Sequence, residues 1–124
     1  MKPLVYVDRS EIRTGKLEEL RGAIADLAAF VAANEPQIVS YAAFIDDDGE
    51  QLMIVHVHRD AASLERHFAI AGPRFASFAE LVRLERIDIY GNPSPGTVVS
   101  LREKAAALGG ATIAIHPQHA GFIR

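Results

Sequence analysis

The sequence predicts one α+β domain whose elements follow the order β-α-β-β-α-β, the ferredoxin-like arrangement, with a helix–strand extension at its end. Short runs of β-forming residues with a period of two alternate with longer segments whose apolar residues recur every three or four positions. The turn Asp46–Gly49 joins two of the β runs directly, which indicates an antiparallel hairpin. The chain has 124 residues, of which 49% are hydrophobic, and this suits a single domain with one core.

In the first half of the chain, residues 3–9 predict the first strand because they are rich in β-forming residues. A helix follows Thr14-Gly15 and ends at Asn34-Glu35-Pro36, since proline disfavours helix at the residue before it. The apolar face of this helix consists of Leu17, Leu20, Ile24, Leu27 and Val31. Residues 37–45 and 51–58 form the two strands of the hairpin.

In the second half, Asp60 or Ser63 caps a helix, and Gly72-Pro73 interrupts this helix before a short further piece. Residues 84–90 alternate as the fourth strand. We assign residues 1–93 to the ferredoxin-like domain and residues 94–124 to a C-terminal extension. The extension contains a predicted helix at 98–108, ended by Gly109, and a predicted fifth strand at 111–116. We expect it to pack on the domain or on a dimer partner.

Three of the strands each have one aliphatic face and one mixed face, because side chains alternate along a strand. The aliphatic residues are Val5, Val7, Met53, Val55, Val57, Ile87 and Ile89. The mixed residues are Tyr6, Asp8, His56, His58, Arg86, Asp88 and Tyr90. We expect the aliphatic face to pack under the helices and the mixed face to meet a second sheet, which predicts a homodimer.

Composition excludes several classes of protein. The net charge is −3, and no segment combines clustered Lys and Arg with aromatic residues, so we expect no nucleic-acid binding. The absence of cysteine excludes disulfides and thiolate chemistry. No window reaches about 18 uninterrupted apolar residues, so we expect no membrane span and a cytoplasmic protein. There is also no phosphate-binding glycine loop, nucleophile elbow or dinucleotide fingerprint.

The segment Arg59–Phe68, followed by Gly72-Pro73-Arg74-Phe75-Ala76-Ser77-Phe78, resembles the antibiotic biosynthesis monooxygenase family. In that family a strand leads into a helix with an Ala-Leu-x-x-His run and then a Pro-x-Phe-x-x-Phe segment. The resemblance covers about the first ninety residues. It implies a dimeric α/β barrel, in which two four-stranded sheets face each other. It also implies relatives that oxygenate phenols, anthrones or quinols without a cofactor.

Three features depart from the family pattern. The family often has an acid two residues before an aromatic at the end of the third strand, where this sequence has His56 and His58. The segment from His67 to Pro73 is one residue longer than usual, and the extension beyond residue 95 lies outside the common unit. The first departure alters the expected wall of a pocket.

His67 is the candidate catalytic residue, since it matches the helix histidine of the family and lies on the apolar face of its helix. The unperturbed pKa of histidine, near 6.5, allows it to accept a proton from a phenolic substrate at neutral pH. The alternative is a structural histidine that bonds a backbone carbonyl or a carboxylate.

Substrate binding is assigned to the candidate residues Tyr41, His56, His58, Tyr90 and Phe68. With His67, the two strand histidines make three imidazoles, the number that an open zinc or iron site uses. If the aliphatic face packs under the helices, however, His56 and His58 do not meet His67, and they form hydrogen bonds at the dimer interface instead. We therefore expect neither a metal nor a cofactor.

The sequence thus favours a cofactor-free, monooxygenase-like homodimer that handles an aromatic, quinol or polyketide-like molecule. The alternatives are a ligand-binding module without catalysis and a structural dimer of the same fold, because one fold hosts many functions.

Overall fold

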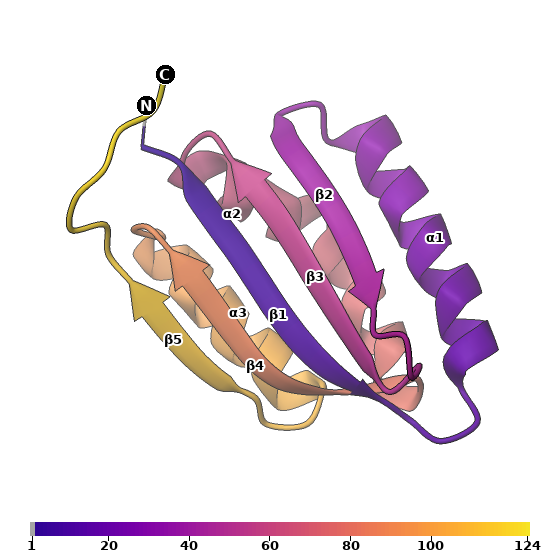
Figure 1. Cartoon of the computed structure of the whole chain (residues 1–124). Coiled ribbons are helices and arrows are strands. Elements are labelled where there is room, and N and C mark those ends of the chain that lie inside the picture. The colour runs from indigo at the N-terminus through magenta and orange to yellow at the C-terminus, as the bar shows by residue number, and fades with distance from the viewer. Residues whose placement is uncertain (1) are drawn as a thin grey trace.

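The computed structural model describes residues 2–124 and confirms the predicted order of elements (Figure 1). The elements are β1 (Leu4–Ile12), α1 (Leu17–Asn34), β2 (Ile38–Ile45), β3 (Gln51–His58), α2 (Ala61–Ala71), the 3-10 helix η1 (Gly72–Glu80), β4 (Val82–Tyr90), α3 (Pro95–Ala107) and β5 (Thr112–His116). The hairpin, the interrupted second helix and both elements of the extension are therefore present.

The five strands form one sheet in the order β2-β3-β1-β4-β5. The first four are antiparallel neighbours in the ferredoxin-like order, and β5 extends the sheet by pairing parallel to β4. Such a parallel connection needs a crossover, which α3 supplies. The register of β1 against β4 shifts between Arg9 and Ser10, where a bulge lies.

Local signals explain where the helices begin. The Asp60 side chain accepts a hydrogen bond from the Ser63 backbone N–H and thereby caps α2. Ser94 caps α3 in the same way through the Thr97 backbone N–H. Pro95 is tolerated as the first helical residue because the amide hydrogen that it lacks has no helical partner at that position, so α3 begins three residues earlier than predicted.

The extension packs on the domain itself over residues 95–116. Leu101, Ala105 and Leu108 of α3 are buried on the main body, and β5 completes one edge of the sheet. Residues 117–124 are exposed and run back toward the N-terminal end of β1 (Figure 1).

The prediction of which sheet face lies under the helices is wrong for β1 and β3. Tyr6 and Asp8 of β1 and His56 and His58 of β3 are all buried, at 0–2% exposure. The aliphatic residues Val5, Val7, Met53, Val55 and Val57 are only partly buried and lie on the open face. In β4, Ile87 and Ile89 are buried beneath the helices as predicted.

Strand register explains this correction. Tyr6 is paired with Ile89, whereas Val5 is paired with Tyr90, and directly paired residues share a face of the sheet. The mixed residues of β1 and β3 are therefore on the same side as the aliphatic residues of β4. Alternation divides each strand into two sets, but it does not say how the sets of neighbouring strands combine.

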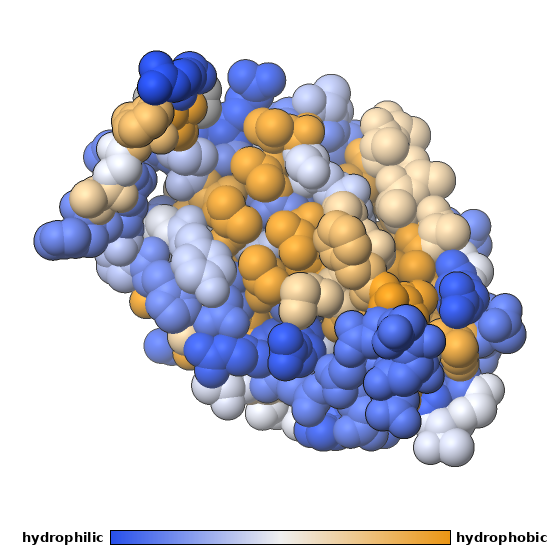
Figure 2. Space-filling view, in the orientation of Figure 1, coloured by the Kyte–Doolittle hydropathy of each residue, from blue (hydrophilic) through white to orange (hydrophobic). Residues whose placement is uncertain are grey.

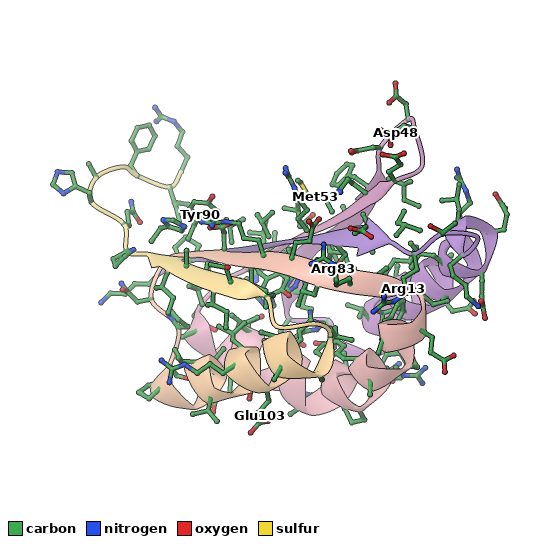
Figure 3. The ribbon with its side chains drawn as sticks, turned by 90° about the horizontal axis from the view of Figure 1, so that it is seen from below. Arg13, Asp48, Met53, Arg83, Tyr90 and Glu103 are labelled. Atoms are coloured by element: carbon green, nitrogen blue, oxygen red, sulfur yellow. The ribbon has the colours of Figure 1, made fainter. Side chains whose placement is uncertain are left out.

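Seen from below, α2, η1 and α3 lie under the sheet, while Met53 and Tyr90 project from the opposite, open face (Figure 3). Apolar side chains gather over β1, β2 and β3 on that open face (Figure 2). They include Val39 and Phe44, each 55% exposed. Within residues 2–124, no helix is long and apolar enough to cross a membrane.

Candidate active site

Polar side chains from β1, β3, α1, α2 and α3 gather in the layer between the sheet and the helices. Buried polar groups are costly unless they form hydrogen bonds. Here they bond one another, and among the residues that the structure describes only Oε1 of Gln37 is buried without a partner. This mutual satisfaction allows β1 and β3 to bury these polar side chains beside the apolar core residues Leu4, Leu52 and Ile54.

The first group in this layer joins Tyr6, Asp8 and Lys104. The Tyr6 hydroxyl donates to Asp8, and Nζ of Lys104 donates to the Tyr6 hydroxyl at 2.6 Å and to Oδ2 of Asp8 at 3.2 Å. The Lys104 side chain is 9% exposed and that of Asp8 is 3% exposed, so this is a buried ion pair. Burial and the negative charge of Asp8 raise the pKa of Tyr6 well above its usual range, which keeps the phenol protonated.

The second group is a chain formed by His56, His58 and Ser63. Nδ1 of His56 bonds Nε2 of His58, and Nδ1 of His58 bonds the Ser63 hydroxyl at 2.7 Å. Burial lowers the pKa of His58 to about 4 and holds the pKa of His56 well below its usual range. Both imidazoles are therefore neutral at pH 7.

Contrary to the prediction, the strand histidines do meet His67. The ring centroid of His67 lies 4.7 Å from that of His56 and 6.0 Å from that of His58. Helix α2 packs on the face that carries them, which is why the predicted separation does not hold. Three of the ring nitrogens are already engaged with each other or with Ser63. Across residues 2–124, no group of three His, Asp or Glu side chains has the geometry to hold a metal ion.

The third group is a buried pair of His67 and Glu35. Nδ1 of His67 lies 3.0 Å from both carboxyl oxygens of Glu35, and the two residues are 1% and 2% exposed. Burial raises the pKa of Glu35 to about 7. Burial, together with the charge of Lys104 and the neighbouring His58, lowers the pKa of His67 to about 3. Nε2 of His67 makes no hydrogen bond to any of residues 2–124.

A narrow cavity adjoins these groups. Its body is apolar and is lined by Ile24, Leu27, Leu52, Ile54, Phe75, Phe78, Val82, Leu84 and Leu108. Its polar lining consists of Asp8, Ser10, Tyr41 and Lys104. The centre of a water molecule can move within only about 30 Å³ of it, so a ring-sized ligand requires side chains to shift.

The predicted site residues separate into those near the cavity and those away from it. Tyr41 lines the cavity, and burial together with the charges of Asp8 and Glu35 raises the pKa of its hydroxyl. His67 lies one side chain behind the cavity, with ring centroids 5.7 Å from Tyr41 and 5.8 Å from Phe75. His56 stacks against Tyr41 with 5.2 Å between centroids.

The other two aromatic candidates lie elsewhere. Phe68 packs edge-on against Phe75 with 5.6 Å between centroids, and it faces a groove outside the cavity. Tyr90 lies on the open face of the sheet, is 47% exposed, and stacks on His116 of β5 with 4.7 Å between centroids.

Two residues of the site were missed by the sequence interpretation. Glu35 was seen only as part of a helix end, and Lys104 only as part of the extension. Asp8 was expected at a dimer interface. The sequence held one signal for Lys104. It lies three residues after Leu101 and therefore on the same side of α3 as this buried residue.

No protein-family model matches the sequence, and a search of curated proteins finds no relative. Solved structures do match. MupZ from Pseudomonas fluorescens superposes with a TM-score of 0.76 at 18% identity, over 100% of this chain and 96% of MupZ.

SnoaB, a cofactor-independent oxygenase from Streptomyces nogalater, superposes with a TM-score of 0.63 at 21% identity, over 76% of this chain and 96% of SnoaB. A conserved protein from Bacteroides thetaiotaomicron, described as a possible oxidoreductase, superposes with a TM-score of 0.62 at 16% identity, over 71% of this chain and 95% of that one. At such identities the likeness shows the fold. It confirms the fold that the sequence predicted, and the match to MupZ includes the extension.

Proposed function

We propose that this protein is a small-molecule enzyme of the cofactor-free monooxygenase type, acting on a phenol, quinol or polyketide-like substrate. The observation that carries the proposal is an apolar cavity whose polar lining, with Asp8, Tyr41 and Lys104, adjoins a buried His67–Glu35 pair. Cavities of this composition suit ring compounds that carry a few oxygens. The named activity of SnoaB supports the same class of reaction on this fold.

In the proposed reaction, His67 accepts a proton from the substrate. The carboxyl group of Glu35 holds Nδ1 of His67 and leaves Nε2 free to act as the acceptor. Because the pKa of His67 is about 3 and that of Glu35 is about 7, the imidazole passes its Nδ1 proton to the Glu35 carboxylate as Nε2 takes the substrate proton, and the pair as a whole takes up its next proton near neutral pH. The substrate anion would then supply electrons to oxygen itself, so the protein provides a base, a dry cavity and hydrogen bonds.

Tyr41 stands between the cavity and His67, and the proposal assigns it two actions. Its side chain lines the cavity, where its hydroxyl would orient a substrate oxygen. Rotation of its side chain would also open the way from the cavity to Nε2 of His67.

The proposed functional unit is a homodimer that forms through the open face of the sheet. Val5, Val7, Met53, Val55 and Val57 form an aliphatic surface there, and Phe44 is 55% exposed beside it. Large apolar patches on a small protein are typical of association surfaces. A second copy would cover this surface, and the cavity on the other side would stay within each subunit.

Oxygen uptake tests the proposal. Purified protein would be mixed with anthrone, 1-naphthol and hydroquinone in an oxygen electrode cell, with products identified by mass spectrometry. The expected result is catalysed uptake that falls by about 100-fold or more in His67→Gln, the usual size of a general-base contribution. His119→Gln, on the exposed tail, is the matched control and keeps the full rate.

Each other outcome points to a different conclusion. A folded His67→Gln variant with full turnover would transfer the proton-acceptor role to another residue, with Asp8 as the next candidate because it lines the cavity. Substrate conversion that continues under argon would indicate acid–base chemistry without oxygen. A ligand that binds and stays unchanged in air would favour the second candidate function, a binding module.

A further inference from the structure

Lys104 occupies a special position in the molecule, since it is brought to the sheet by a helix of the C-terminal extension. Besides its bonds to Tyr6 and Asp8, its ammonium group lies 4.3 Å from the centroid of the Phe75 ring. A desolvated cation over an aromatic face is held there by the ring electrons. Lys104 is thus fixed by contacts with β1 and η1.

Two cavities meet at this point. The interior cavity and an open groove between η1 and α3 have only Phe75 and Lys104 in common among their lining residues. The groove is bordered by Gly72, Ser100 and Ala107 among others. Phe75 and Lys104, which are in contact with each other, therefore form the wall between the groove and the interior cavity.

The chemistry at this point is that of a donor beside an acceptor. An ammonium group has three N–H donors, and the two contacts to Tyr6 and Asp8 leave one of them for a ligand. A carboxylate accepts about four hydrogen bonds, so Asp8 also retains capacity. The two charges cancel each other, and the pair therefore suits a neutral ligand that both accepts and donates better than it suits a simple anion.

We propose that Lys104 and Asp8 together recognise a hydroxy ketone, in which the carbonyl oxygen accepts from Lys104 and the hydroxyl group donates to Asp8. The inference rests on the proposed small-molecule site and names its substrate class: a ring compound with a carbonyl and a hydroxyl group on neighbouring positions or one atom apart. The aliphatic lining of the cavity holds the rest of the ring. Lys104 and Asp8 are substrate-recognising residues in this account, and His67 remains the proton acceptor.

Three small bicyclic probes test the inference without turnover. They are 3-hydroxy-1-indanone, which has both groups, 1-indanone, which has the carbonyl alone, and 1-indanol, which has the hydroxyl alone. Dissociation constants would be measured by NMR titration. The expected result is that the hydroxy ketone binds about tenfold more tightly than either single-group probe, because a hydrogen bond to a charged group is worth at least that factor.

Variants assign this preference to the pair. Lys104→Met is expected to weaken binding of 3-hydroxy-1-indanone and 1-indanone by about tenfold and to leave 1-indanol nearly unchanged. Arg102→Met, an exposed cation on the same helix, is the matched control and changes none of the three. Because Lys104→Met leaves Asp8 without its cation, the doubly neutral variant Asp8→Asn/Lys104→Met is measured as well. It should fold and bind the three probes with similar affinities.

Wild-type protein that binds the three probes within about twofold of one another would overturn the inference, as would a Lys104→Met variant that keeps the preference. These failures differ from failure of the proposed function. Oxygen uptake with phenols and no preference among the indane probes would remove the role of the pair and leave the enzyme. A clear preference without oxygen uptake would leave the recognition site and remove the oxygenase.

Discussion

The two faces of the sheet differ in where β1 and β3 place their polar and their aliphatic residues. The face under the helices carries Tyr6, Asp8, His56 and His58 and is buried, whereas the open face carries the valines of β1 and β3. In most antiparallel sheets the aliphatic face is buried and the polar face is solvated. We interpret the buried polar residues as part of the proposed ligand site. We interpret the open valines as part of the proposed dimer interface.

The energetic cost of this inversion is met differently on the two faces. Under the helices, every buried imidazole, carboxyl and ammonium group described above has a hydrogen-bonded partner. On the open face, the aliphatic side chains of β1 and β3 are only partly buried, and hydrophobic side chains lie at the surface (Figure 2). If this account is right, loss of the polar network under the helices should destabilise the fold. A charge placed on the open face should instead weaken dimerisation.

The largest expected effect is on the buried ion pair. Asp8→Ala should reduce the free energy of unfolding by about 3–5 kcal/mol, because it leaves the ammonium group of Lys104 buried without a counter-charge. Urea denaturation measures this change. Adding Lys104→Met should restore most of the loss, since no buried charge then remains. A single variant that loses less than about 1 kcal/mol would mean that Lys104 simply turns to solvent.

The second effect is on the pH dependence of stability. His58 has a pKa of about 4 in the folded protein because of burial, against an ordinary value of 6.5. Between these two pKa values the unfolded chain binds a proton at His58 that the folded chain does not bind. The contribution of neutral His58 to the free energy of unfolding is therefore fully present above pH 6.5 and is lost as the pH falls toward 4. The field of Asp60 opposes this shift, and the raised pKa of Glu35 gives the opposite slope from pH 4.5 to 7.

The measurement is urea denaturation of wild type and His58→Gln at pH 7 and pH 4.5. The loss between the two pH values should be smaller in the variant by roughly 2–3 kcal/mol. His119→Gln, which alters an exposed histidine, should behave as wild type. Equal losses in all three proteins would show that His58 is not held neutral by burial.

The third effect is on association. Val55 lies on the open face of β3, which is flanked by β1 and β2. Val55→Lys would therefore place a charge in the middle of the proposed dimer interface. The dimer dissociation constant should rise by about 100-fold, as expected for a buried charge without a partner. Sedimentation velocity over a range of concentrations measures it. Val99→Lys, at a residue of α3 that is 53% exposed, is the control and should leave the constant unchanged.

The smallest effect concerns Tyr41. Removing its hydroxyl in Tyr41→Phe should weaken the binding of 3-hydroxy-1-indanone by about fivefold, the value of one neutral hydrogen bond, and should leave the unfolding free energy within about 0.5 kcal/mol. A loss of stability without a loss of binding would show that the hydroxyl supports the fold rather than the ligand.

Much of the fold followed from local signals. The hairpin at Asp46–Gly49, the cap at Asp60 and the stop at Gly109 are consequences of turn and cap chemistry that a sequence displays directly. His67 was singled out through a resemblance, and Tyr41 was proposed as a pocket residue from its place on a strand and lines the cavity.

The site as a whole did not follow, because its contacts join distant parts of the chain. Lys104 is 96 residues from Asp8, and Glu35 is 32 residues from His67, so no local pattern links them. The faces were interchanged because polarity was used as the guide to burial. The sequence does not show the hydrogen bonds that offset the cost of burying Tyr6, Asp8, His56 and His58.

The separate roles of the two faces are tested most directly by the binding of 3-hydroxy-1-indanone to the Val55→Lys variant, measured by NMR at a concentration where sedimentation shows a monomer. Our account predicts a folded monomer whose dissociation constant for the probe is within about threefold of the wild-type value, since Val55 and the cavity lie on opposite faces. A variant that stays dimeric, or a folded monomer that no longer binds the probe, would contradict the account.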